Sequence, residues 1–211
     1  MRPAKYLHNY PGVTTIVGFG SAFEFWHRSV AKKNPGKNPF DICDAIKKES
    51  QDIGHHVHDG IEKYLSGEPL NEIEKNLTLQ EQKMLSILIE WCNKMEFQPV
   101  VMEQSRYSHK HQFAGTYDAH NIRFFTDWKT DKTPKCKRGK GDNLDREIKY
   151  GLQMGGYSIA EEEETGILIN EAYVVRAAKN FDHDVYYFSD LTDYRKQFLI
   201  LREAYKIIKR K

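Results

Sequence analysis

The chain has 211 residues, of which 39% are hydrophobic and 29% charged, and its formal net charge is +2. This length fits one domain spanning residues 1–211, with a mainly helical part (1–97) before a sheet core and C-terminal helices (98–211). No apolar run approaches the length of a membrane span, and the first residues lack the apolar stretch of a secretory signal. We therefore expect a cytoplasmic protein of a bacterial or phage-infected cell, neither secreted nor membrane-bound.

The three cysteines argue against cysteine chemistry. Cys43, Cys92 and Cys136 are far apart, odd in number and form no C-x-x-C pair. This spacing disfavours a disulfide framework and a thiolate-held zinc site. We expect incidental thiols and no iron–sulfur cluster.

The predicted elements alternate between helices and strands. Apolar residues recur every four positions from Phe40 to Leu65, which predicts a helix. Thr78 and Glu81 form a capping box that opens a second helix, running to about Glu96. Three strands follow in the order of an antiparallel meander. After a basic loop at 131–142, the pattern predicts a helix at 144–164, strands near 166–176 and 184–189, and a last helix from about Thr192 to Lys209 with Phe198, Leu201, Tyr205 and Ile208 facing the core. The fold class is α+β, a central mixed sheet flanked by helices.

The predicted meander carries an unusual concentration of charge beside apolar residues. Its strands are near Val100–Tyr107, Phe113–Ala119 and Phe124–Thr130. Residues two apart in a strand share a face, so Asp127 and Lys129 point the same way. If 118–127 is a hairpin with an even loop, Asp118 lies on that face too, opposite Asp127 or one pair along. Two carboxylates about 5 Å apart repel unless a cation or proton lies between them, so we expect Asp118, Asp127 and Lys129 to form a hydrolytic metal site.

Further candidates come from other segments. His58 lies beside the apolar stripe of the helix at 40–65, one turn after Gly54. A zinc site is disfavoured because His55, His56 and His58 do not share the four-residue spacing of two ligands on one face. Glu103 is an acid in an apolar strand. Gln153 and Tyr157 are neighbours on a later helix face.

Positive charge is concentrated directly after the candidate site. Lys129 is followed within twelve residues by a basic run that could contact DNA phosphates. A solvated loop would show the same composition. The candidate DNA-contacting residues in this run are Lys132, Lys135, Lys137, Arg138 and Lys140.

Taken together, these motifs resemble the PD-(D/E)XK nuclease superfamily, in its RecB-like exonuclease branch. The matching segments run in the order of that family: 54–62 around His58, Glu103, 113–118, 125–130 and 153–157. Residues 10–15 and Trp26 are also similar to the N-terminal segment of phage members and of the mitochondrial genome maintenance exonuclease.

The resemblance implies a restriction-endonuclease-like α/β/α core and a role for each matching residue. His58, Asp118, Asp127 and the Trp128 carbonyl would bind Mg²⁺ or Mn²⁺, and Lys129 would be the catalytic lysine. Glu103 is included among the catalytic candidates, and Gln153 and Tyr157 would contact DNA. The expected activity is Mg²⁺-dependent hydrolysis of DNA, mainly at single-stranded ends, in replication, recombination or repair, with proteins of those processes as possible partners.

Two other functions fit the same residues. A structure- or sequence-specific endonuclease of the superfamily would use the same site. A non-catalytic DNA-binding recombination module would bind DNA with a steep salt dependence and no turnover.

Overall fold

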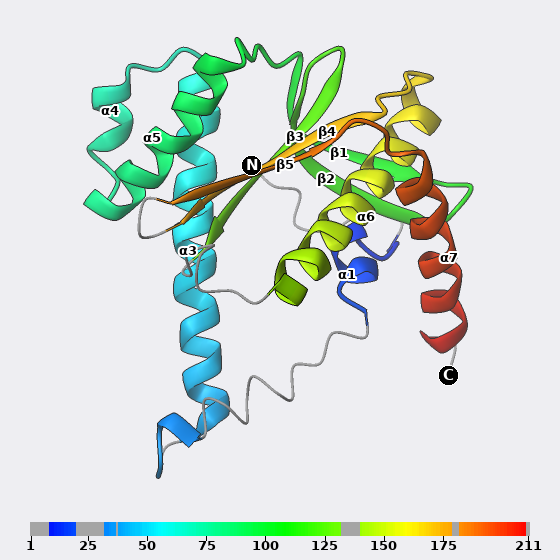
Figure 1. Ribbon diagram of the computed structural model, residues 1–211, viewed down its shortest axis with the longest axis horizontal. Helices are drawn as coiled ribbons and strands as arrows, with labels where there is room; N and C mark the ends of the chain where they lie inside the picture. The colour runs from blue at the N-terminus through cyan, green and yellow to red at the C-terminus, as the bar shows by residue number, and fades with distance from the viewer. Residues whose placement is uncertain (1–8, 20–31, 37, 132–139, 179–181, 210–211) are drawn as a thin grey trace.

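A mixed five-stranded sheet forms the centre of the molecule (Figure 1). The computed structural model describes residues 9–19, 32–36, 38–131, 140–178 and 182–209. The spatial order of the strands equals their order in the sequence, and all neighbours are antiparallel except β3 and β4, which are parallel. The strands are β1 (Val101–Ser108), β2 (Phe113–His120), β3 (Phe124–Asp131), β4 (Glu171–Ala178) and β5 (His183–Phe188).

Helices cover both faces of this sheet, as Figure 1 shows. One buried cluster joins α1, α6 and α7 to the sheet, and a second joins α3 and α5 to it. The parallel pair β3–β4 requires a crossover connection, and α6 lies within it. The expected mixed sheet between helices is therefore confirmed. The helices are α1 (Val13–Val17), α3 (Pro39–Leu65), α4 (Leu70–Glu74), α5 (Leu79–Lys94), α6 (Lys140–Thr165) and α7 (Thr192–Lys209).

The start of α5 and the buried face of α3 agree with the sequence patterns. The Thr78 side chain accepts a hydrogen bond from the Glu81 amide, and the Glu81 carboxylate accepts one from the Thr78 amide, which is the predicted capping box of α5. In α3, Val57 and Ile61 are fully buried against α5 and the sheet. This apolar stripe fixes the face of α3 that meets the strands.

Some predicted boundaries and core positions are wrong. The strand expected from residue 166 begins at Glu171. Helix α6 ends at Thr165, Gly166 after it adopts the left-handed region, and Ile167 and Leu168 that follow are about half exposed. Helix α6 begins at Lys140, inside the expected loop 131–142. Ile208 in the last turn of α7 is 52% exposed, so it does not belong to the core face of this helix as the periodicity predicts.

The remaining sequence predictions concern membrane spans, the cysteines and residues outside the described ranges. Among the described helices, none has both the length and the apolar character needed to cross a membrane. Cys43 and Cys92 are buried free thiols. Outside the described residues lie Trp26, Lys132, Lys135, Cys136, Lys137 and Arg138, together with the side chain of Lys140.

Candidate active site

Asp118 and Asp127 face each other where β2 and β3 separate. The ladder pairs His120 with Phe125 and Ala119 with Thr126, and the same register puts Asp118 opposite Asp127. No further rung forms: instead, Asp118 Oδ2 accepts a hydrogen bond of 2.7 Å from the Trp128 amide. The carboxylate thus takes the place of a strand carbonyl, and the hairpin register expected from the sequence is present.

Asp127 is held from two sides. Gln153 of α6 donates from Nε2 to Asp127 Oδ1 at 3.0 Å, and the Lys129 ammonium forms an ion pair with Oδ2. Burial raises the pKa of Asp127 to about 6, with Asp118 adding to the rise and Lys129 opposing it. Burial alone would lower the pKa of Lys129, but the two aspartates hold it above its usual value, so the lysine stays charged.

His58 approaches Asp118 from α3. Its Nδ1 lies 3.5 Å from Asp118 Oδ1, and both side chains are almost buried. The charge of His58 holds the pKa of Asp118 low against the effect of burial. A Cβ at Gly54 would lie 3.3 Å from Thr130 Oγ1, so glycine at this position lets α3 pack closely on β3 and brings His58 to the strands.

Glu103 reaches the same place from β1. The pairs of Met102 with Ala119 and Gln104 with Tyr117 put Glu103 level with Asp118. Its φ of 45° is a conformation that residues with a side chain seldom adopt in a strand, and such strain is concentrated at functional sites. One donor atom each from His58, Glu103 and Asp118 lie within 4.8 Å of one another.

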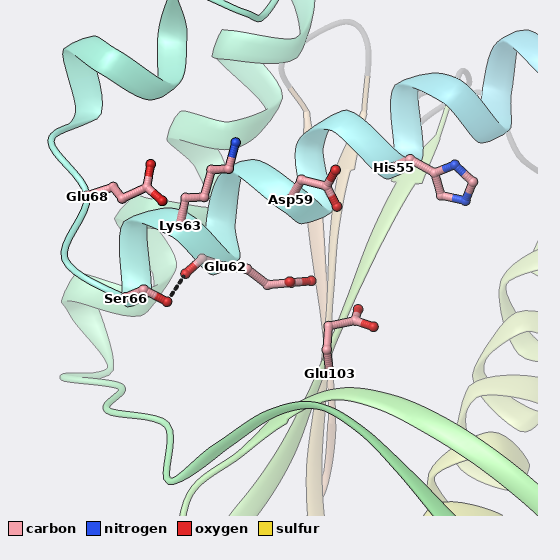
Figure 2. Close-up of a pocket in the computed structure, with 7 residues that line it drawn as sticks. All are labelled: His55, Asp59, Glu62, Lys63, Ser66, Glu68 and Glu103. Carbon is pink, nitrogen blue, oxygen red and sulfur yellow. Dashed lines mark hydrogen bonds between the residues drawn. The ribbon is translucent and has the colours of Figure 1, made fainter. Parts of the chain in front are cut away.

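A cleft of about 520 Å³ opens beside Glu103. In Figure 2, Glu62 of α3 and Glu103 of β1 both point into this space. Burial, a hydrogen bond to Glu103 and the charge of Glu103 raise the pKa of Glu62 to about 8. The sequence places Glu62 one turn after His58, yet only the fold reveals its contact with Glu103.

The donor set fits a hard divalent cation. Two carboxylates and an imidazole converge, and the pKa of Glu62 beside Glu103 is raised by burial and by the Glu103 carboxylate. Carboxylate oxygens are ligands that Mg²⁺ and Mn²⁺ prefer. His58, Glu103 and Asp118 would hold the cation. Asp127 lies opposite Asp118 on the neighbouring strand.

Helix α6 adds residues that the sequence did not single out. Gln153 donates a second hydrogen bond, to the Tyr157 hydroxyl at 3.0 Å, so the predicted pair is in contact. Arg146 lies two turns before Gln153 on the same face, and Tyr150 lies one turn before it. Their spacing from Gln153, seven and three residues, is the signal that could have identified them.

Comparison with known proteins supports the fold. No family model matches the chain, and no curated protein matches it. The crystal structure of a protein described as a putative exonuclease from Eubacterium rectale aligns with a TM-score of 0.55 and 14% identity, covering 92% of this chain and 77% of that one. An alkaline exonuclease from Laribacter hongkongensis aligns with a TM-score of 0.31 and 13% identity over 59% of this chain and 68% of that one. The first likeness shows that the chain shares the fold of the Eubacterium rectale protein.

Proposed function

We propose that this chain is a metal-dependent deoxyribonuclease of the PD-(D/E)XK superfamily, formed as one domain over residues 1–211. The observation that carries the proposal is the convergence of His58, Glu103 and Asp118 next to the Asp127–Lys129 ion pair. Helix α3 and three strands supply these groups, and a chance pattern of surface charge would not bring them together in a largely buried position. The name of the Eubacterium rectale protein agrees with this function.

Each residue has a role in hydrolysis of a phosphodiester bond. Mg²⁺ or Mn²⁺ held by His58, Glu103 and Asp118 would supply Lewis acidity toward water and the phosphate. Asp127, fixed by Gln153, keeps the Lys129 ammonium at the site. The ammonium stabilises negative charge that develops on the phosphate oxygens. Asp127 and the Trp128 carbonyl remain proposed additional ligands.

We further propose a preference for single-stranded ends. The basic run Lys132–Lys140 would follow the DNA backbone, and Tyr157 would contact the DNA beside Gln153. No iron–sulfur cluster takes part. The partners of this protein would be DNA and proteins of replication or recombination.

The decisive assay incubates pure protein with end-labelled single- and double-stranded DNA in Mg²⁺, Mn²⁺ or EDTA. We expect cleavage that EDTA abolishes and that is lost in Asp127→Ala and Lys129→Ala. Asp52→Ala and Lys149→Ala remove similar charges from exposed positions on α3 and α6 and serve as matched controls. Absence of EDTA-sensitive cleavage, or full activity in Lys129→Ala, would falsify the proposal.

Closed circular single strands separate the alternatives. An end-dependent exonuclease leaves them intact, whereas an endonuclease of the same superfamily cuts them. DNA binding that weakens steeply with salt, without turnover, would identify a non-catalytic module.

A further inference from the structure

One face of α6 meets β3 in successive contacts. Arg146 donates to Asp131 Oδ2 at 2.7 Å, and seven residues later Gln153 donates to Asp127 Oδ1 at 3.0 Å. Two helical turns therefore run alongside the five strand residues from Asp127 to Asp131. The middle positions of this alignment are Tyr150 on the helix and Lys129 on the strand.

Tyr150 lies between two cations. Burial raises the pKa of the Tyr150 hydroxyl, and the charges of Lys129 and Arg146 are the next largest influences and oppose the rise. The pKa of Arg146, which burial would lower, is held up by Asp131 and by a hydrogen bond to Tyr150. The Tyr150 ring packs edge-on against Tyr186 of β5, with 5.2 Å between ring centroids, so β5 supports the ring that carries the hydroxyl.

The hydroxyl lacks an acceptor in these two neighbours. Lysine and arginine side chains only donate hydrogen bonds, so the phenol oxygen can accept from them while its own proton is available to another acceptor. Asp127, whose charge also acts on Tyr150, accepts a hydrogen bond from Gln153 and forms an ion pair with Lys129. Because its pKa is raised, the phenol stays protonated at neutral pH and remains a donor.

The position is accessible to a ligand. The side chains of Lys129 and Arg146 are 28% and 33% exposed, and Tyr150 is partly exposed between them. Two cations with a fixed hydroxyl donor between them suit a phosphate, whose non-bridging oxygens accept several hydrogen bonds.

We propose that the Tyr150 hydroxyl, together with Arg146 and Lys129, binds a non-bridging oxygen of a DNA phosphate next to the bond that is cleaved. Tyr150 is then a substrate-binding residue distinct from the Gln153–Tyr157 pair. This inference rests on the proposed nuclease function, because it requires DNA to lie along the Lys129 edge of the site.

The test combines one hydroxyl deletion with single phosphate replacements. Binding of a labelled single-stranded oligonucleotide is measured in EDTA for the wild type, Tyr150→Phe and Tyr194→Phe. Tyr194 of α7 packs on Gly151 of α6, so Tyr194→Phe makes the same chemical change at the contact between these two helices. Each phosphate of the oligonucleotide is then replaced in turn by an uncharged methylphosphonate.

We expect Tyr150→Phe to weaken binding about tenfold, as for a lost hydrogen bond to a charged acceptor. Tyr194→Phe should bind like the wild type. One methylphosphonate position should penalise the wild type strongly and Tyr150→Phe about tenfold less, since the two changes remove the same contact.

Two results would overturn the inference. One is a methylphosphonate series in the wild type without any sensitive position, which needs no variant to fold. The other is a series in which each methylphosphonate weakens binding to Tyr150→Phe by the same factor as binding to the wild type. EDTA makes the test independent of cleavage, so a protein that binds DNA but never cuts it refutes the nuclease proposal while the Tyr150 contact is still judged on binding.

Discussion

Gln153 donates one hydrogen bond to Asp127 and another to Tyr157, each at 3.0 Å, and so joins α6 to the acid at the centre of β3. Asp127 is almost completely buried, and a buried carboxylate needs such partners to keep its position and its charge. The orientation of the Asp127–Lys129 pair therefore depends on a residue from a different element.

Replacing Gln153 tests this dependence. In Gln153→Leu, Asp127 loses a hydrogen bond to a charged acceptor, so we expect cleavage to slow by about tenfold or more and the free energy of unfolding to fall by about 1–3 kcal/mol. Single-turnover cleavage and urea denaturation measure the two effects. Gln197→Leu, at an exposed position of α7, is the control. Equal cleavage rates in the two variants would contradict a role for Gln153 in positioning Asp127.

Metal binding is measurable without any activity assay. A cation that binds only the folded state at about 100 times its Kd raises the free energy of unfolding by about 2.7 kcal/mol. We expect Mn²⁺ to raise the thermal midpoint of the wild type and of Asp52→Asn, which changes an exposed acid on α3. Asp118→Asn should show little or no rise, because it removes a charged ligand from the group with His58 and Glu103. A rise as large as that of the wild type would exclude Asp118 as a ligand.

The contact between Glu62 and Glu103 makes the metal-free protein sensitive to pH. Burial and the contact with Glu103 raise the pKa of Glu62 from 4.5 to about 8 in the folded state. The folded state therefore binds this proton more tightly than the unfolded chain. The contribution of Glu62 to the free energy of unfolding is complete below about pH 4.5 and is lost as the pH rises through about 8.

Urea denaturation in EDTA at about pH 5 and about pH 9 measures the loss. We expect Glu62→Gln to reduce the difference between the two midpoints. Glu68→Gln changes an exposed acid that lines the same cleft and should leave the difference unchanged. An unchanged difference in Glu62→Gln would assign the pH dependence to other groups.

Gly155 tests the packing of α6 on α7. A Cβ there would lie 2.8 Å from the Tyr194 carbonyl carbon and 2.9 Å from the Arg195 amide nitrogen, and the backbone of α7 cannot move aside locally. We expect Gly155→Ala to lower the free energy of unfolding by about 1–3 kcal/mol. Helix propensity by itself predicts the opposite, a gain of about 1 kcal/mol. Urea denaturation decides between them, and a more stable variant would show that the two helices separate at little cost.

The amino-acid sequence determined most of the elements. Helical periodicity predicted α3, and the capping box located the start of α5, because both signals depend on residues within one or two turns. Alternation and short loops predicted the three strands that precede α6. The boundaries near Lys140 and Glu171 were wrong because helix ends depend on packing beyond the local pattern.

Local sequence signals also identified the individual candidate residues. The face shared by Asp127 and Lys129, and the register of Asp118 against Asp127, follow from strand geometry. Only the tertiary structure showed that Glu62 meets Glu103 and that Tyr150 stands beside Lys129. These contacts join residues 41 and 21 positions apart, as the residue numbers give, on different elements. Their distances and charges depend on how α3 and α6 pack against the sheet, which no local pattern encodes.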